Sequence, residues 1–390
     1  MTSGALRGWR LVHRWTSLVS TLFLLMLCIT GLPLVLGDEI EHWAGGAPPA
    51  YAAGTAVHNL DKMVAHAHAR FPTEQLFSIV MAEDEGFVRV YLTPSWAAYG
   101  RDRGAAHWLD FDARSGSALS PHSRQALRVE SIIATARTLH TDMFAALPGR
   151  LTLAAMAILL ILSLVSGTVI YGPFTRKLAF GAIRSSRSRT RWLDLHNLLG
   201  IATVAWLLIV GATGAMNEIT TPLFRNWQQN DVAAMLAPWR GQPPVDQPHF
   251  ISINRAAAEA ARAAPGMTMA SMVFPGHPVG SPHHVLFWMR GESALSGRLL
   301  NPVLVDARTG AFSGHVAMPF HLRLLQLCRP LHFGDYGGMP LKILWELLDV
   351  VTIVVLGSGL YLWIARPRRE RAAARAQGLH GASPAMEPAE

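Results

Sequence analysis

The sequence predicts a membrane protein: an all-α bundle of four spanning helices, with two α+β domains outside the bilayer and an internal duplication. Three observations support this prediction. The chain of 390 residues is 51% hydrophobic and only 15% charged, whereas a soluble globular chain has about 25% charged residues. Four apolar stretches could cross a bilayer, and short motifs recur in the same order in both halves.

The composition excludes several classes of protein. Such an apolar chain is neither disordered nor collagen-like. Its net charge is +8, and its basic residues lie beside apolar stretches, which favours a membrane over a nucleic acid as the partner. Two cysteines, Cys28 and Cys328, are too few for a disulfide scaffold, a Cys-rich zinc site or a Cys-ligated iron–sulfur cluster. The sequence has no C-x-x-C-H motif, so covalent c-type haem is excluded.

Charge-free windows locate the spans. Windows of 23, 25 and 23 residues follow Arg14, Arg150 and Asp194, and each exceeds the about 20 residues that a spanning helix needs. The window after Asp349 has only 16 residues, so the fourth helix must begin near Leu341. The predicted division is 1–14 N-terminus, 15–37 first span, 38–135 first external domain, 136–172 second span with an external extension, 173–193 basic loop, 194–217 third span, 218–328 second external domain, 329–365 fourth span with an external extension, and 366–390 tail.

Basic residues indicate the orientation. Lys and Arg concentrate at the N-terminus, in the loop between the second and third spans and in the tail. An excess of Lys and Arg in short loops marks the cytoplasm, so we expect both termini there and both long segments outside. A cleaved signal peptide is the alternative for the first span, but its window exceeds the about 7–15 apolar residues of such peptides.

Matching motifs indicate the duplication. At an offset of 183, Trp9-Arg-Leu-Val-His13 aligns with Trp192-Leu-Asp-Leu-His196, and Thr30-Gly31 with Thr213-Gly214. At an offset of 192, Leu139-His140 aligns with Leu331-His332, Pro148 with Pro340, and Ser166-Gly167 with Ser358-Gly359. Each half therefore reads as helix, external domain, helix.

The external segments have an α+β pattern. Alanine-rich stretches at 57–70 and 254–264 predict helices, and alternating runs predict strands at 87–92, 107–111, 284–289 and 302–305. Each segment closes on an Asp-Ala-Arg-x-Gly turn, at 112–116 and 306–310. Pieces rich in Pro and Gly at 45–49 and 238–248 are predicted linkers.

Four histidines form two pairs by the duplication. His13 and His196 open spans on the cytoplasmic side, and His140 and His332 precede spans on the outer side. A lone histidine at a helix end is usually a cap or an interfacial residue, but paired imidazoles at membrane depth are candidates for function. Two imidazoles on facing helices suit the axial positions of a haem iron in an apolar bundle.

Zinc is the alternative ligand for these histidines. Zinc normally takes three or four protein ligands, and no carboxylate or thiol lies within a turn of His13. Asp194 precedes His196 closely, but we expect it to face water at a polar helix start. These considerations favour haem over zinc for both pairs.

Other polar and small residues have two interpretations each. Gly31, Gly214, Gly167 and Gly359 could admit a flat ring or could serve helix packing. Glu346 and Asp349 share a helix face and could form a proton path or screen haem charge, or Glu346 could pair with Lys342. Adjacent His283 and His284 would point to opposite faces of a strand, so we expect no metal site there and solvent exposure for both.

The duplicated Trp-x-x-x-His, the Leu-His followed eight residues later by Pro, and the twin external segments together resemble the PepSY-associated transmembrane helix family. The resemblance covers residues from about Trp9 to Arg366 and is closest to its di-haem siderophore reductases. It implies a protein of the bacterial inner membrane, often linked to iron uptake. The two external domains would then be PepSY-like.

The resemblance implies a function and its cofactors. Two b-type haems would carry electrons outward, with His13 and His196 ligating the cytoplasmic-side haem iron and His140 and His332 the outer one. The chain would be an oxidoreductase that reduces a ferric siderophore, such as one of the hydroxamate class, from Fe(III) to Fe(II). Tryptophans that could line the siderophore site, or belong to an interfacial belt, are Trp43, Trp96, Trp108, Trp227 and Trp239.

The electron donor is not contained in this chain. No strand-linked G-x-G-x-x-G motif for FAD or NAD is present, so a quinol or a cytoplasmic reductase must supply electrons. Two alternative functions stay open: a b-type cytochrome that reduces another acceptor, and a non-redox binding or transport component.

Overall fold

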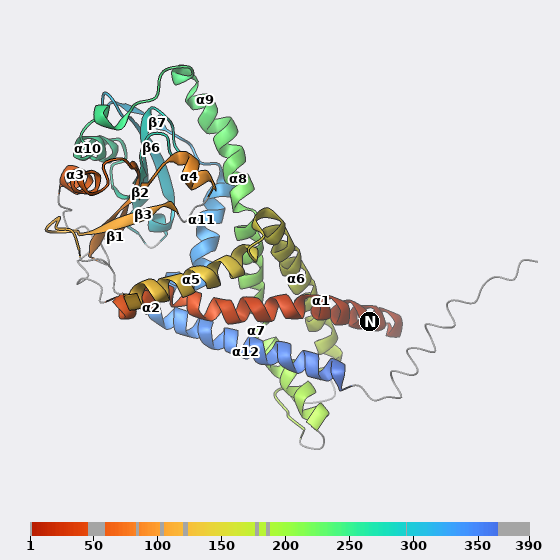
Figure 1. The fold of residues 1–390 in the computed structure, drawn as a ribbon. Coiled ribbons are helices and arrows are strands. Elements are labelled where there is room, and N and C mark those ends of the chain that lie inside the picture. Colours follow the sequence, from red (N-terminus) through yellow and green to blue (C-terminus); the bar gives the residue numbers. More distant parts are fainter. Residues whose placement is uncertain are drawn as a thin grey trace, which may run out of the picture. The chain divides into compact units, whose positions relative to one another are not determined.

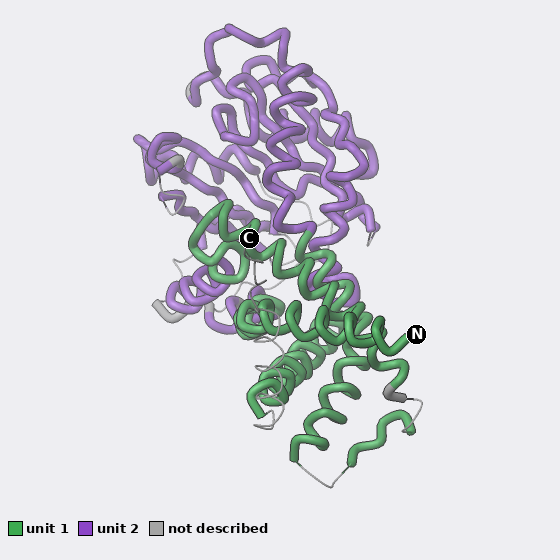
Figure 2. The backbone as a smooth tube through the Cα atoms, turned by 90° about the vertical axis from the view of Figure 1, so that its right-hand side faces the viewer, with its two compact units in different colours: residues 1–35, 139–215, 339–390 green, residues 36–138, 216–338 purple. Residues whose placement is uncertain are grey.

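The computed structural model describes residues 2–45, 59–82, 86–101, 105–119, 124–175, 179–184, 188–293 and 295–365. The tail 366–390, most of the linker 45–49 and the start of the helix expected at 57–70 lie outside the described residues. The chain divides into two compact units, each drawn from both halves of the sequence (Figure 2). We call residues 1–35, 139–215 and 339–390 the membrane unit, and residues 36–138 and 216–338 the sheet unit.

Four long helices make up the membrane unit: α1 (Ser3–Val35), α6 (Ala146–Thr175), α7 (Ser188–Glu218) and α12 (Gly338–Ile364). Each is long and apolar enough to cross a membrane, so the structure has four candidate spans, as the sequence predicted. Large apolar side chains on these helices are exposed, such as Leu22 at 75% and Leu347 at 59%. Such exposure suits contact with lipid rather than water.

Small residues bring the spans together. A methyl group at Gly211 of α7 would lie 3.2 Å from Cδ2 of Leu160 on α6. Hydroxyl groups in the bundle bond to their own helix, as Thr203 Oγ1 does in donating to the Leu199 carbonyl at 2.9 Å. Close helix contacts at small residues and internally satisfied hydroxyls are typical of membrane bundles.

The sheet unit is built on one antiparallel sheet of seven strands, in the order β3-β2-β1-β4-β5-β6-β7 (Figure 1). The strands are β1 (Gln75–Ala82), β2 (Phe87–Thr93), β3 (His107–Asp112), β4 (Met267–Val273), β5 (His284–Gly291), β6 (Leu300–Asp306) and β7 (Phe312–His315). The helices and turns around them are α2 (Gly37–Gly45), α3 (Leu60–Arg70), α4 (Trp96–Arg101), α5 (Arg124–Asp142, which continues into the membrane unit), α8 (Thr220–Trp227), a π turn (Gln228–Val232), α9 (Ala233–Met235), α10 (Ile253–Ala263), α11 (Phe320–Phe333) and short 3₁₀ turns at Ala237–Trp239, Gln247–His249, Ser296–Arg298 and Asp335–Gly337.

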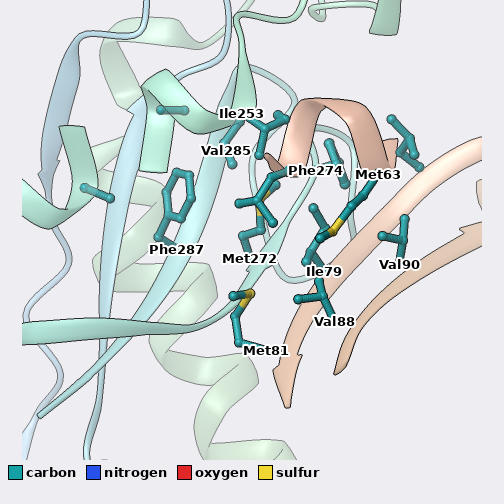
Figure 3. Packing of buried hydrophobic residues seen from close by; sticks show 14 of the residues in the cluster. Met63, Ile79, Met81, Val88, Val90, Ile253, Met272, Phe274, Val285 and Phe287 are labelled. Atoms are coloured by element: carbon teal, nitrogen blue, oxygen red, sulfur yellow. The ribbon is translucent and has the colours of Figure 1, made fainter. Parts of the chain in front are cut away.

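Side-chain alternation along the strands builds a core on each face of this sheet. Met272 and Val285 point to the face covered by α3 and α10, where they pack with Met63 and Ile253 (Figure 3). Their neighbour Val273 belongs to the second core, with side chains of α8 and α11. Successive residues of a strand face opposite sides, so one sheet closes two cores.

The two halves of the chain share the sheet. β1 pairs with β4 through Ser78 and Val273, Ile79 and Met272, and Val80 and Ser271. The starts of α3 and α10 also bond to each other: Asn254 Oδ1 accepts from the Leu60 amide at 3.0 Å, and Asp61 accepts from the Ser252 hydroxyl at 2.6 Å. The sequence predicted two external domains, whereas the described strands of both form one continuous sheet.

Candidate functional site

His13 and His196 meet in the membrane unit. His13 lies on α1 and His196 on α7, and their ring centres are 6.5 Å apart with the rings inclined at 65°. Both lie within spanning helices. The structure therefore brings together the two residues that the sequence paired across 183 positions.

Each of these imidazoles donates a hydrogen bond from Nδ1. Nδ1 of His13 lies 2.9 Å from the carbonyl oxygen of Ser163 on α6. Nδ1 of His196 lies 3.0 Å from the carbonyl oxygen of Val355 on α12. A carbonyl can only accept, so Nδ1 must carry the hydrogen in both rings. In the neutral imidazole, Nε2 then has the free lone pair that a metal requires.

His140 has a comparable environment. It lies in the last turn of α5, and its Nδ1 is 2.9 Å from Oγ1 of Thr30 on α1. The Thr30 hydroxyl already donates to the Met26 carbonyl at 2.8 Å. Because its one hydrogen is used there, Oγ1 accepts from His140, and the ring hydrogen of His140 therefore lies on Nδ1.

His332 lies in the last turn of α11, which ends at Gly334 with φ of +78°. Its ring packs edge-on against Phe333, with centres 5.4 Å apart. His332 belongs to the sheet unit and His140 to the membrane unit. Their common role therefore stays a prediction from the sequence.

Glycines lie directly against the imidazoles. A methyl group at Gly167 would be 3.0 Å from Cε1 of His13, and one at Gly359 would be 3.2 Å from Cε1 of His196. A methyl group at Gly31 would be 3.5 Å from Cε1 of His140. The ring that lies against these three glycines in the structure is a histidine side chain.

An acidic side chain reaches the same place as His140. Oδ2 of Asp349 on α12 would lie 3.7 Å from a methyl group at Gly31. One turn away, Oε1 of Glu346 is buried and has no hydrogen-bond partner. Unpaired carboxylate oxygens in a membrane are costly, so this part of α12 is a candidate for a functional role.

Asp194 does not face water, as the sequence analysis expected. It is only 3% exposed, and its carboxylate accepts from Nε and Nη2 of Arg184 at 3.0 and 2.7 Å. It also accepts from the Arg184 backbone amide at 2.9 Å. This bidentate pair folds the basic loop back onto the start of α7, which residue spacing alone does not reveal.

His283 and His284 are buried, which corrects the prediction that they are exposed. They are 7% and 0% exposed. His283 precedes the strand, while His284 begins β5 under the Trp239 ring, with ring centres 4.5 Å apart. Burial lowers the pKa of His284 to about 4, so it is neutral at physiological pH. Ser281 Oγ lies 2.9 Å from its Nδ1.

The five candidate tryptophans have different surroundings. Trp227 is 4% exposed and donates from Nε1 to the Ala317 carbonyl at 3.0 Å, so it belongs to the core. Trp108 packs under the Arg89 guanidinium, whereas Trp43 is 74% exposed. Trp96 joins Phe77 and His277 in an aromatic cluster.

The comparisons identify the family. The model of the PepSY-associated TM region matches residues 10–366, so the chain belongs to this family, as the sequence motifs predicted. The chain is also similar to the uncharacterized protein PA4219 of Pseudomonas aeruginosa, with 28% identity over 254 residues. That match covers 58% of this chain and 62% of the relative, so the chain spans less than two thirds of the relative's length.

Sequence reasoning missed the acceptors of the histidines. Ser163 and Val355 contribute backbone carbonyls, which no side-chain pattern can indicate. Thr30 was noticed only as a marker of the repeat. The available signal was that a hydroxyl residue precedes a glycine at each of the four repeat positions.

Proposed function

We propose that this protein is an electron carrier of the bacterial inner membrane that holds two b-type haems and reduces a ferric siderophore outside the membrane. Both termini would be cytoplasmic. His13 and His196 would ligate one haem iron, and His140 and His332 the other. The siderophore would be of a class with hard oxygen donors, such as a hydroxamate.

The observation that carries the proposal is the hydrogen bonding of His13 and His196. Both donate Nδ1–H to a backbone carbonyl of another spanning helix, at 2.9 and 3.0 Å. Histidine ligands of metals almost always have their second ring nitrogen held in this way, which fixes the tautomer and the ring orientation. A histidine that merely caps a helix end does not need such a hydrogen bond to another helix. Here two histidines on facing helices both have one.

The spacing of the two rings suits one iron between them. The ring centres of His13 and His196 are 6.5 Å apart, so the two imidazoles could hold one haem iron between them. Within the described parts of the chain, no three His, Cys, Asp or Glu side chains are grouped to hold an ion. A zinc site would normally need such a group, so the donor set favours haem.

The chain itself would do three things in this function. Its histidines would hold their lone pairs in place, its apolar helices would exclude water, and its sheet unit would receive the siderophore. When bound, haem supplies a one-electron Fe(III)/Fe(II) couple. Adding one electron to siderophore-bound Fe(III) gives Fe(II), whose lower charge weakens its bonds to hard oxygen donors, so iron leaves and the chelator survives intact.

The test is an absorbance spectrum of the protein purified in detergent after haem-replete expression. We expect sharp low-spin b-type bands on reduction with dithionite and about two haems per chain by pyridine haemochrome assay. The reduced protein should be reoxidised by a ferric hydroxamate and not by the gallium complex, which cannot accept an electron.

Each outcome of this experiment has a separate meaning. Absence of haem would contradict the proposal and leave a binding or transport protein. Haem that is reoxidised by another acceptor, but not by a ferric siderophore, would keep the electron carrier and contradict its substrate.

A further inference from the structure

Four hydroxyl–glycine dipeptides recur in the spans: Thr30-Gly31, Ser166-Gly167, Thr213-Gly214 and Ser358-Gly359. In the structure, three of them lie against an imidazole from another helix. Gly31 meets His140, Gly167 meets His13 and Gly359 meets His196. The repeat therefore marks a recurring contact, and it needs a physical explanation.

The glycine explains how the ring approaches. A Cβ at Gly167 would lie 3.2 Å from Nδ1 of His13, and one at Gly359 would lie 3.6 Å from Nδ1 of His196. Without the side chain, each ring reaches the carbonyl four residues earlier, at Ser163 and Val355. A larger residue would hold the ring away from that acceptor.

The hydroxyl explains which ring nitrogen is used. Ser358 Oγ lies 3.1 Å from Nδ1 of His196, and Thr30 Oγ1 lies 2.9 Å from Nδ1 of His140. The Ser358 hydroxyl donates to the Val355 carbonyl at 2.8 Å, as Thr30 donates within its own helix. With their hydrogens used, both oxygens can only accept from Nδ1–H. At Ser166 the contact with His13 is longer, at 3.5 Å.

We propose that each of these three dipeptides is a seat for one haem-ligating histidine, and that Thr30 and Ser358 are positioning residues that set the reduction potential of the haem iron. This inference rests on the proposed function. An acceptor at Nδ1 makes the imidazole a stronger donor at Nε2, and the stronger donor stabilises Fe(III) over Fe(II). Removing the acceptor therefore raises the reduction potential.

The hydroxyl is tested at Thr30, where a valine keeps the shape of the side chain. In the haem-loaded protein, we expect Thr30→Val to favour Fe(II) about tenfold at one of the two haems, which is a rise of 59 mV for a one-electron couple. Thr30→Ser should restore the wild-type value. Thr203→Val is the matched control, because Thr203 is fully buried and bonds its own helix in the same way.

The measurement is a spectroelectrochemical titration with haem quantified per chain. Loss of one haem in Thr30→Val that Thr30→Ser recovers would also support the seat. Potentials and haem content equal to those of Thr203→Val would overturn it. A wild-type protein without haem would instead contradict the proposed function, so the two failures are distinguishable.

The glycine is tested by two matched pairs of variants. Gly167→Ala and Gly359→Ala should lower the affinity for one haem by about 10–100-fold, the usual effect of losing a group that orients a metal ligand. Gly172→Ala and Gly357→Ala, on the same two helices, meet no atom within 4 Å and should bind haem like the wild type. Haem titration compares Gly167→Ala with Gly172→Ala on α6, and Gly359→Ala with Gly357→Ala on α12. Equal haem affinities in both comparisons would overturn the role proposed for the glycines.

Discussion

Replacing His13 by alanine should remove one of the two proposed haems and leave the other. The remaining spectrum should be that of a low-spin b-type haem, because the proposed ligands of the other haem, His140 and His332, are unchanged. His196→Ala should give the same result, since both rings would ligate one iron across the 6.5 Å that separates them. The quantity to measure is haem per chain, by pyridine haemochrome assay.

Combinations of variants make this prediction sharper. The double variant His13→Ala/His196→Ala should lose no more haem than either single variant, because both remove the same site. His13→Ala/His140→Ala should lose both haems. His68→Ala is the control, since this histidine is exposed on α3. If His13→Ala kept both haems, or if the two members of a pair affected different haems, the ligand assignment would be wrong.

The membrane spans could be predicted from the sequence because their signal is local. An uninterrupted apolar window is sufficient to identify a spanning helix, and all four windows correspond to long helices. Some strands were also predictable: the run at 284–289 lies within β5, and that at 107–111 lies within β3. These segments alternate clearly or are bounded by turn residues.

The centre of the sheet could not be predicted in the same way. β1 and β4 join the two halves, and their pairing brings Ile79 to Met272 across about half of the chain. Nothing in either strand alone specifies this partner. A pattern that describes one half therefore predicts separate domains, whereas backbone pairing between the halves makes one sheet.

Burial of polar side chains was the other failure. Asp194 and His284 were expected to face water because their local sequence is polar. Each is covered by a partner that the local sequence does not indicate: Arg184 bonds Asp194, and Trp239 packs on His284. A buried polar group requires a partner, and that partner is a property of the tertiary structure.

Gly149→Ala should strongly destabilise the connection between α5 and α6. A methyl group at Gly149 would lie 1.7 Å from the backbone oxygen of Asp142, and backbone cannot move aside as a flexible side chain can. The same oxygen accepts from the Ala145 amide at 2.9 Å, so shifting it would break the turn. We expect a cost of about 3 kcal/mol in the free energy of unfolding, the upper end of the range for overpacking.

The turn at Gly149 also allows a variant of opposite sign. Ala146 has φ of +50°, and Gly338, its equivalent at the 192 offset, has φ of +57°. Glycine adopts this conformation without strain, so Ala146→Gly should stabilise the protein by about 1 kcal/mol.

Thermal unfolding in detergent would compare both variants with Gly172→Ala, whose added methyl group meets no atom within 4 Å. If Gly149→Ala unfolded at the wild-type temperature, the close approach to Asp142 would be wrong. If Ala146→Gly were as unstable as Gly149→Ala, the whole turn would be sensitive to substitution. The clash with the Asp142 oxygen would then not be needed to explain the result at Gly149.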